Sequence, residues 1–161
     1  MRNDLTAARL RELLHYDPET GVFTRVTSNP ATNGRPVGWL DGKGHRYLRV
    51  GGVIYAAHRL AWLFSYGEWP RDVIDHVNGE KDDNRLPNLR DVDMYINMQN
   101  IRRARIDSST GILGVSQYKK RFRADIKVNG KRKYLGNFIT PELAHAAYVA
   151  AKRLYHPGCT I

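Results

Sequence analysis

Hydrophobic residues recur with the spacing of an α-helix in four stretches of the chain. Apolar side chains three or four positions apart lie on one face of a helix, so each stretch predicts an amphipathic helix. The expected helices, with the residues of their apolar faces, are 5–15 (Leu10, Leu13, Leu14), 58–67 (Leu60, Leu63, Phe64), about 94–104 (Met94, Met98, Ile101) and one that starts at Pro141 (Leu143, Ala147, Ala150, Leu154). Gly67 is placed to end the second helix, and Thr140 to cap the last one.

Stretches rich in β-branched and alternating residues lie between these helices and predict short strands. We expect strands at 21–26, 45–57, 72–75 and 88–92, and two or three more within 114–138. The pairs Gly51-Gly52 and Asn129-Gly130 suit the tight two-residue turns of hairpins. A mixture of small antiparallel sheets and helices predicts an α+β fold.

The clearest alternation occupies residues 121–128. Successive side chains of a strand point to opposite faces, so one face of this strand is apolar and the other is polar. The apolar face carries Phe122, Ala124, Ile126 and Val128, and the polar face carries Arg121, Arg123, Asp125 and Lys127. We therefore expect a sheet that packs on a helix through one face and exposes a basic face on the other.

Charge divides the chain into two parts. The net charge is +10, which commonly reports a polyanionic partner. Residues 1–110 contain 16 Lys and Arg against 14 Asp and Glu, whereas residues 111–161 contain 10 against 2. This asymmetry predicts two modules with different tasks.

The remaining composition narrows the class of protein. Cys159 is the single cysteine, which excludes an internal disulfide and a cysteine-rich zinc site. No apolar run reaches the roughly 20 residues that span a bilayer, and the first residues lack the apolar core of a secretion signal. We expect a cytoplasmic protein with no membrane partner.

An amide lies among the apolar residues of the third expected helix, at Asn97. A buried amide costs a few kcal/mol, roughly, unless it is hydrogen-bonded, so polar groups should face it. In a strand–strand–helix unit the natural neighbours are Asp75 and His76, at the end of the first strand. Asp75 and Asn97 offer oxygen ligands for Mg²⁺, and His76 offers a nitrogen that accepts protons near neutral pH. The group suits phosphodiester hydrolysis.

The spacing of Asp75, His76, Asn88 and Asn97 resembles the motif of the HNH endonucleases, or ββα-metal (His-Me finger) nucleases, with Asn97 in place of the last histidine. The stretches HRLAW, GEWP, IDHVNG, DNR and NLR extend the resemblance over about residues 15–105 and are similar to phage and intron-encoded members. The resemblance implies an N-terminal ββα-metal module flanked by small strands and helices.

The resemblance also implies a role for each motif residue. His76 would be the general base, and Asp75 and Asn97 would hold one Mg²⁺, which Mn²⁺ can replace. Asn88 would act as a catalytic-site residue by tying the intervening loop through its backbone and so orienting the imidazole. The products would carry 5′-phosphate and 3′-hydroxyl ends.

A structural alternative exists for the same residues. Asn, Asp and Gly are frequent in turns for backbone reasons, so residues 75–79 can be no more than a turn. Asn97 can likewise serve only to cap a neighbouring carbonyl. Four further polar residues are expected to serve the structure alone, as loop residues (Asp82, Asp83, Asn84) or as a packing residue (His58).

The C-terminal third, about residues 108–156, is similar to the APETALA2/ethylene-response-factor DNA-binding domain through GV, the YLG-F pattern and the A-AY-AA helix. That family has three antiparallel strands packed on one helix, and its exposed strand faces contact DNA. By position, the DNA-binding residues here would be Ser116, Tyr118, Arg121, Arg123, Lys127, Arg132 and Tyr134. Leu113, Ser116 and Tyr118 replace usual contacts of the family, so its base preference does not carry over.

Together these patterns predict an HNH nuclease domain at 1–104, a linker at 105–111 and an APETALA2-like domain at 112–161. The expected function is metal-dependent, homing-type cleavage of double-stranded DNA in a phage-infected or bacterial cell, by nicking if the chain acts as a monomer. The alternatives are a DNA-binding transcriptional regulator with an inert HNH module, and an RNA-binding protein, because phosphate attraction does not distinguish the two nucleic acids. The sequence leaves open the target, a monomer or a homodimer, and whether Asn100 and the arginines of 102–105 contact DNA.

Overall fold

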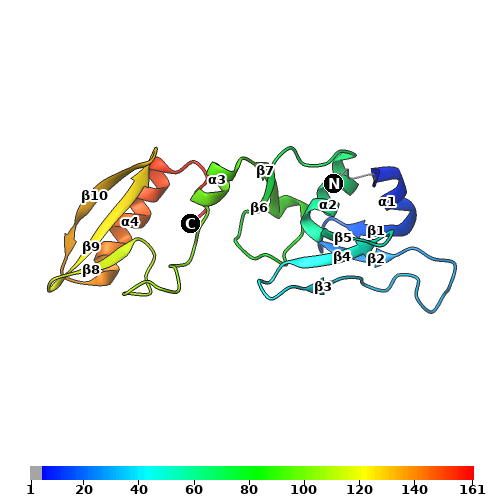
Figure 1. Cartoon of the computed structure of the whole chain (residues 1–161), viewed down its shortest axis with the longest axis horizontal. Coiled ribbons are helices and arrows are strands. Elements are labelled where there is room, and N and C mark those ends of the chain that lie inside the picture. Colours follow the sequence, from blue (N-terminus) through cyan, green and yellow to red (C-terminus); the bar gives the residue numbers. More distant parts are fainter. Residues whose placement is uncertain (1–4) are drawn as a thin grey trace. The chain divides into compact units, whose positions relative to one another are not determined.

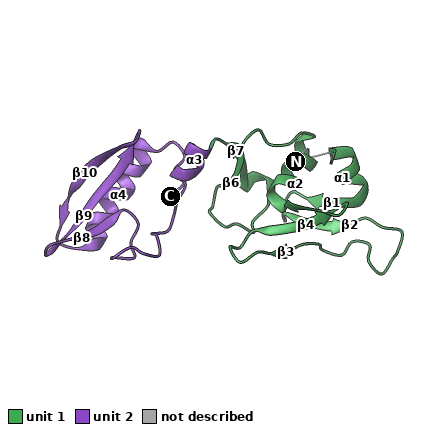
Figure 2. Ribbon diagram, viewed as in Figure 1, with its two compact units in different colours: residues 1–93 green, residues 94–161 purple. Residues whose placement is uncertain are grey.

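The computed structural model describes residues 5–161 and contains two compact units, one ending at Asp93 and one running from Met94 to Ile161 (Figures 1 and 2). Both units combine small antiparallel sheets with helices, so the α+β fold class is confirmed. The first unit ends before the helix that we expected to close the first domain. The division into a nuclease domain, a linker and a DNA-binding domain stays a prediction.

Between residues 5 and 93, the first unit is built from three small sheets and two helices. The β1-β2 hairpin, the β3-β4-β5 sheet and the β6-β7 pair are all antiparallel. In chain order the elements are α1 (Ala7–Leu13), β1 (Leu14–Asp17), β2 (Val22–Arg25), β3 (Trp39–Leu40), β4 (Arg46–Val50), β5 (Val53–Ala56), α2 (Ala57–Tyr66), β6 (Val73–His76), the 3₁₀ turn η1 (Leu86–Asn88) and β7 (Leu89–Val92).

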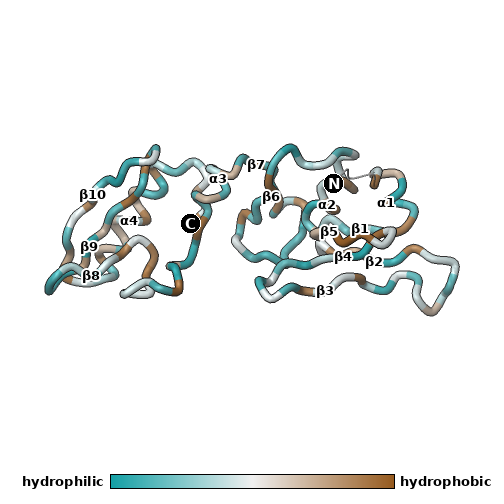
Figure 3. The backbone as a smooth tube through the Cα atoms, in the orientation of Figure 1, coloured by the Kyte–Doolittle hydropathy of each residue, from teal (hydrophilic) through white to brown (hydrophobic). Residues whose placement is uncertain are grey.

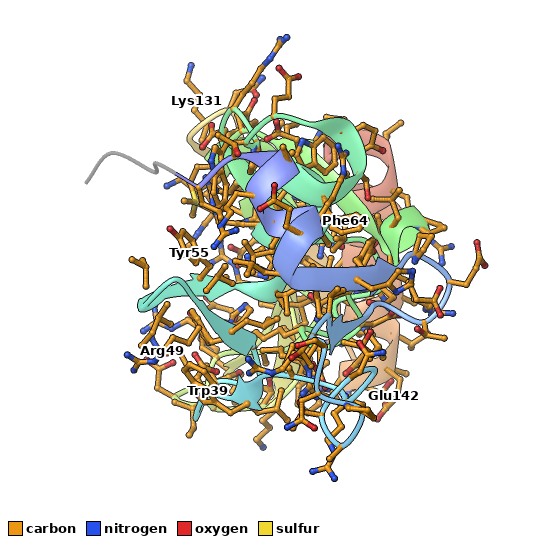
Figure 4. The ribbon with its side chains drawn as sticks, turned by 90° about the vertical axis from the view of Figure 1, so that its right-hand side faces the viewer. Trp39, Arg49, Tyr55, Phe64, Lys131 and Glu142 are labelled. Atoms are coloured by element: carbon orange, nitrogen blue, oxygen red, sulfur yellow. The ribbon has the colours of Figure 1, made fainter. Side chains whose placement is uncertain are left out.

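The core of the first unit lies between α1, α2 and the sheets. Figure 3 shows how hydrophobic and hydrophilic stretches alternate along the backbone of both units. Leu10 and Leu60 are fully buried. The rings of Tyr16, Phe23 and Phe64 form an aromatic cluster with centroids 4.8 to 6.4 Å apart (Phe64 is labelled in Figure 4). This cluster fixes the first hairpin against α2.

Local turn chemistry was predicted correctly. Val50 pairs with Val53, so Gly51 and Gly52 form a two-residue turn, and both have positive φ. Gly67 ends α2 in the left-handed conformation, as expected. The first helix is shorter than predicted, because Leu14 leaves it to begin β1.

The second unit has one three-stranded antiparallel sheet, ordered β10-β9-β8, with one long helix packed on it. Its elements are α3 (Met94–Gln99), β8 (Val115–Tyr118), β9 (Arg121–Val128), β10 (Lys131–Phe138) and α4 (Pro141–Tyr155). Ala124 and Ile126 are buried against α4, which confirms the apolar face of β9. Thr140 caps α4 by accepting a hydrogen bond from the backbone N–H of Leu143 at 3.3 Å.

The predicted apolar face of α4 was wrong. Leu143 and Leu154 are 49% and 72% exposed, whereas Ala144, Tyr148 and Ala151 are buried. Small alanines allow the helix to approach the sheet closely, and Tyr148 fills the remaining space beside Gly114.

The predicted apolar face of the third expected helix, at about 94–104, was also wrong. Met94, Met98 and Ile101 are each at least half exposed, and the helix ends at Gln99. The buried residues are instead Gln99 and Asn100. The side-chain oxygens of both residues accept hydrogen bonds from the C-terminal segment: Gly158 N–H donates to Gln99 Oε1 at 2.9 Å, and the Thr160 hydroxyl donates to Asn100 Oδ1.

Within residues 5–161, no helix combines the length and the apolar character needed to cross a membrane.

The close approach at Gly114 generates a stability prediction. A Cβ added there would lie 2.1 Å from ring carbons of Tyr148, whereas one added at Gly130 would meet nothing within 4 Å. The two glycines have similar φ, +75° and +79°, so backbone strain is matched. We expect Gly114→Ala to lower the free energy of unfolding by about 2 kcal/mol more than Gly130→Ala does. Urea denaturation would measure both, and equal losses would contradict the contact.

Candidate active site

Asp75 and His76 are the last two residues of β6 and are both buried, with 7% and 6% exposure. The antiparallel register places Asp75 opposite Arg90 and His76 opposite Leu89 on β7. Strand β6 thus ends on two ionisable side chains, and the loop that follows closes over the histidine.

The Asp75 carboxylate forms an ion pair with Arg90. Arg90 Nε lies 2.9 Å and Nη2 2.7 Å from the same oxygen, Asp75 Oδ2. A buried carboxylate needs such a partner, because removing an unpaired charge from water costs several kcal/mol. This arginine was not predicted from the sequence, although strand register was a signal that could have found it.

Three imidazoles gather at the end of β6. The ring of His76 lies 5.2 Å from that of His58, on α2, and 6.2 Å from that of His45, just before β4. His58 was expected to be a packing residue, and it is partly buried. It also faces His76 edge to face, which its position in the sequence did not reveal.

Burial keeps these imidazoles neutral. Desolvation lowers the pKa of His76 below its ordinary value, and a hydrogen bond to Asn84 and the charge of Asp75 partly oppose that shift. Burial, with the neighbouring His76, lowers the pKa of His58 to about 3. Neutral imidazole is the form that accepts a proton, so His76 is available as a base near pH 7.

The loop between β6 and β7 is held by Asn88. Asn88 Oδ1 accepts from the backbone N–H of Asn78 at 2.9 Å, and Nδ2 donates to the backbone carbonyl of Asp83 at 2.7 Å. These are the backbone bonds expected of this residue. Its part in catalysis stays a prediction.

Two acidic residues stabilise the same loop, Asp82 through a strand outside it and Asp83 through a residue within it. Asp82 accepts two 2.7 Å hydrogen bonds from Arg46 of β4. The Arg85 guanidinium bonds both oxygens of Asp83 and holds the pKa of that carboxyl at about 2. We expected these acids to be loop residues, and in the structure both bind arginine side chains.

The expected metal ligands Asp75 and Asn97 belong to different units. Asn97 lies on α3, is partly buried, and stays a predicted ligand. The donor chemistry of Asp75 suits a hard divalent cation, since an ionised carboxylate is anionic and accepts at two oxygens.

The seven predicted DNA-binding residues share one face of the β8-β9-β10 sheet. Residues directly opposite each other in an antiparallel sheet point to the same side. The register sets the opposed pairs as Ser116 with Arg123, Tyr118 with Arg121, Lys127 with Arg132, and Tyr134 with Asp125.

One carboxylate sits within that basic face. Asp125 Oδ1 lies 2.9 Å from Arg132 Nε, and Oδ2 lies 3.5 Å from Arg123 Nε. The Arg123 guanidinium also lies over the ring of Tyr134, at 5.2 Å. The cations of this face are therefore partly held in place, which the alternation of residues 121–128 did not reveal.

Comparison with known proteins adds to this geometry. Residues 55–99 match the HNH endonuclease family. The resemblance based on the motif is thereby confirmed over this HNH segment, which runs from β5 to α3. No curated protein sequence matches the chain.

A solved structure, described as DNA binding and cleavage by the HNH homing endonuclease I-HmuI, is similar to the chain at 21% identity. The match covers 91% of this chain and 88% of that chain, with a TM-score of 0.44. The likeness of residues 108–156 to the APETALA2 domain stays a prediction.

The neutral His58 generates a prediction about pH. Its pKa is about 3 in the folded chain against an ordinary 6.5, so below pH 6.5 the unfolded chain binds a proton that the folded chain excludes. The free energy of unfolding should then fall as the pH drops from 6.5 toward 3, by up to about 1.4 kcal/mol per pH unit from this group. In His58→Gln the fall should be shallower, as urea denaturation at pH 7, 6 and 5 would show. Parallel curves for the two proteins would contradict the assignment.

Proposed function

We propose that the protein is a metal-dependent DNA endonuclease of the HNH type. The observation that carries the proposal is a buried, neutral His76 beside the Asp75 carboxylate at the end of β6, inside the HNH segment. A base next to an anionic oxygen donor is the pairing that hydrolysis of a phosphodiester needs.

His76 accepts a proton from the water that attacks the scissile phosphorus. As the new P–O bond forms, the bond from phosphorus to the 3′ oxygen breaks, and the leaving oxygen takes up a proton from solvent water, which gives 5′-phosphate and 3′-hydroxyl ends. Asn88 keeps the loop after His76 in place through its two backbone bonds. Arg90 orients the Asp75 carboxylate.

Asp75 and Asn97 are the proposed ligands of one Mg²⁺, with Mn²⁺ as a substitute. When bound, such an ion offsets the charge that develops on the phosphate and on the leaving oxygen. Asp75 brings the negative charge that attracts the ion, and Asn97 would add a neutral oxygen.

The basic face of the second unit is proposed to bind double-stranded DNA. Its cations, with Tyr118 and Tyr134 among them, suit contact with phosphates and base edges in the major groove. One active site cuts one strand, so a single chain would nick its target in the manner of a homing endonuclease.

A second candidate is a DNA-binding regulator whose HNH segment is inert. The Asp75–Arg90 ion pair favours it, because the carboxylate proposed to hold the metal is already neutralised by a cation. A nuclease must bind the metal with this pair intact or displace Arg90, whereas a regulator has no such requirement.

Cleavage of supercoiled plasmid and phage DNA with Mg²⁺ distinguishes the two. We expect nicked product from the unaltered protein, none with EDTA, and at least about a 100-fold lower rate for His76→Ala, since the general base is lost. His15→Ala is the matched control, because His15 is an exposed histidine of the same unit whose ring contacts Phe64 rather than His76. DNA that is bound but uncut, with Mn²⁺ also tried, would support the regulator.

The salt dependence of binding tests the basic face. The double variant Arg121→Gln with Arg123→Gln should bind DNA more weakly and with a flatter plot of log affinity against log salt, since removing one phosphate interaction lowers the slope by about 1. Arg153→Gln is the control, because Arg153 lies on α4 of the same unit. Fluorescence anisotropy on duplex DNA at several salt concentrations would measure this, and an unchanged steep slope would place the DNA face elsewhere.

A further inference from the structure

Asn84 contacts the proposed base directly. Its side chain is 1% exposed, and Asn84 Oδ1 lies 3.2 Å from His76 Nε2. Asn84 belongs to the loop after β6, and the sequence predicted only a loop role for it. No step of the cleavage described above uses it.

The orientation of the Asn84 amide follows from its second partner. Asn84 Nδ2 lies 3.1 Å from the backbone carbonyl of Asp82. A carbonyl oxygen can only accept a hydrogen bond, so the amide nitrogen must face Asp82. Asn84 Oδ1 is thereby turned toward His76.

This orientation decides where the imidazole carries its proton. Asn84 Oδ1 has no hydrogen to give, so His76 Nε2 must be the donor in their contact. A neutral imidazole holds one proton on nitrogen, so a proton on Nε2 places the lone pair on Nδ1. One backbone carbonyl, that of Asp82, thus selects the tautomer of His76 through a single amide.

The backbone of Asn84 is fixed from the first hairpin. The Tyr16 hydroxyl donates to the Asn84 carbonyl at 2.7 Å, and the Leu86 N–H donates to the Pro18 carbonyl at 3.0 Å. Burial raises the pKa of Tyr16, so its hydroxyl stays a donor. Gly21 completes the clamp, since a Cβ there would lie 2.6 Å from backbone atoms of Asn84 and Arg85.

We propose that Asn84 is a positioning residue that holds His76 as the Nε2–H tautomer and so presents Nδ1 as the proton acceptor. The tautomer stands on geometry alone. Its effect on catalysis rests on the proposed nuclease function.

The tautomer is measured without substrate or metal. In protein with ¹⁵N-labelled histidine at pH 7.5, two-bond ¹H–¹⁵N correlation spectra should show His76 protonated on Nε2. That N–H should exchange slowly with water because Asn84 holds it. Neutral His76 protonated on Nδ1 in the unaltered protein would overturn the proposal, whether or not any variant folds.

Variants distinguish the effect of the Asn84 side-chain amide on His76 from the effect of the loop as a whole. Asn84→Ala should speed exchange of the Nε2 proton at least about 10-fold, whereas Asn84→Asp keeps an acceptor and should retain the slow proton. Asn78→Ala is the matched control: it removes an asparagine of the same loop that bonds Asp83 and the Glu80 N–H but not His76. The Asn78→Ala protein should retain the slowly exchanging Nε2 proton. If exchange is as fast in Asn78→Ala as in Asn84→Ala, the effect of Asn84 is explained by the stability of the loop, and the positioning role is contradicted.

Single-turnover cleavage at saturating DNA tests the catalytic consequence. We expect Asn84→Ala to cut about 10- to 100-fold more slowly with unchanged DNA affinity, as for loss of other partners that orient a functional histidine. An unchanged rate would overturn the catalytic role of Asn84. An unaltered protein that never cuts but shows a slow Nε2 proton would instead refute the nuclease function and leave the tautomer standing.

Discussion

The burial of two ionisable side chains at the end of one short strand constrains the rest of the first unit. Asp75 and His76 lose the water that would stabilise their charged forms, so the structure must supply partners or keep them neutral. Arg90 supplies the partner for the carboxylate, and the loop of residues 77–88 supplies hydrogen bonds for the imidazole side. Further polar contacts from the hairpin and from β4 hold that loop in turn.

The contacts that hold His76 in place form successive layers around it. Asn84 touches His76, the backbone of residues 82–88 holds Asn84 and Asn88, and residues of β1 and β4 hold that loop. Each layer consists of bonds between groups with little freedom, such as a backbone carbonyl or a bidentate guanidinium. The second unit uses the same device on its surface, where Asp125 restrains two arginines that would otherwise lose more conformational entropy on binding an anion.

Local rules explain what the sequence could predict. Gly51-Gly52, Gly67 and Thr140 act through their own backbone or that of near neighbours, and the alternation of 121–128 needs only the period of a strand. The motif residues around His76 could be identified for the same reason, since their spacing is fixed within one strand–loop–strand unit. The buried faces of α3 and α4 could not, because Gln99 and Tyr148 are buried by partners about 60 and 30 residues away. Arg90, His45, His58 and Asn84 were missed on similar grounds, since their importance comes from what folds against them.

The bidentate contact between Arg46 and Asp82 comes from a strand that precedes the stretch matched to the HNH family. The stretch shared with the HNH family begins at residue 55, yet Arg46, Tyr16 and Pro18 all lie before it and hold the loop that carries Asn84. The matched stretch by itself contains His76 and Asn84 but lacks these three residues. The part of the chain that fixes this loop is therefore larger than the stretch that matches the HNH family. It must reach back at least to the first hairpin.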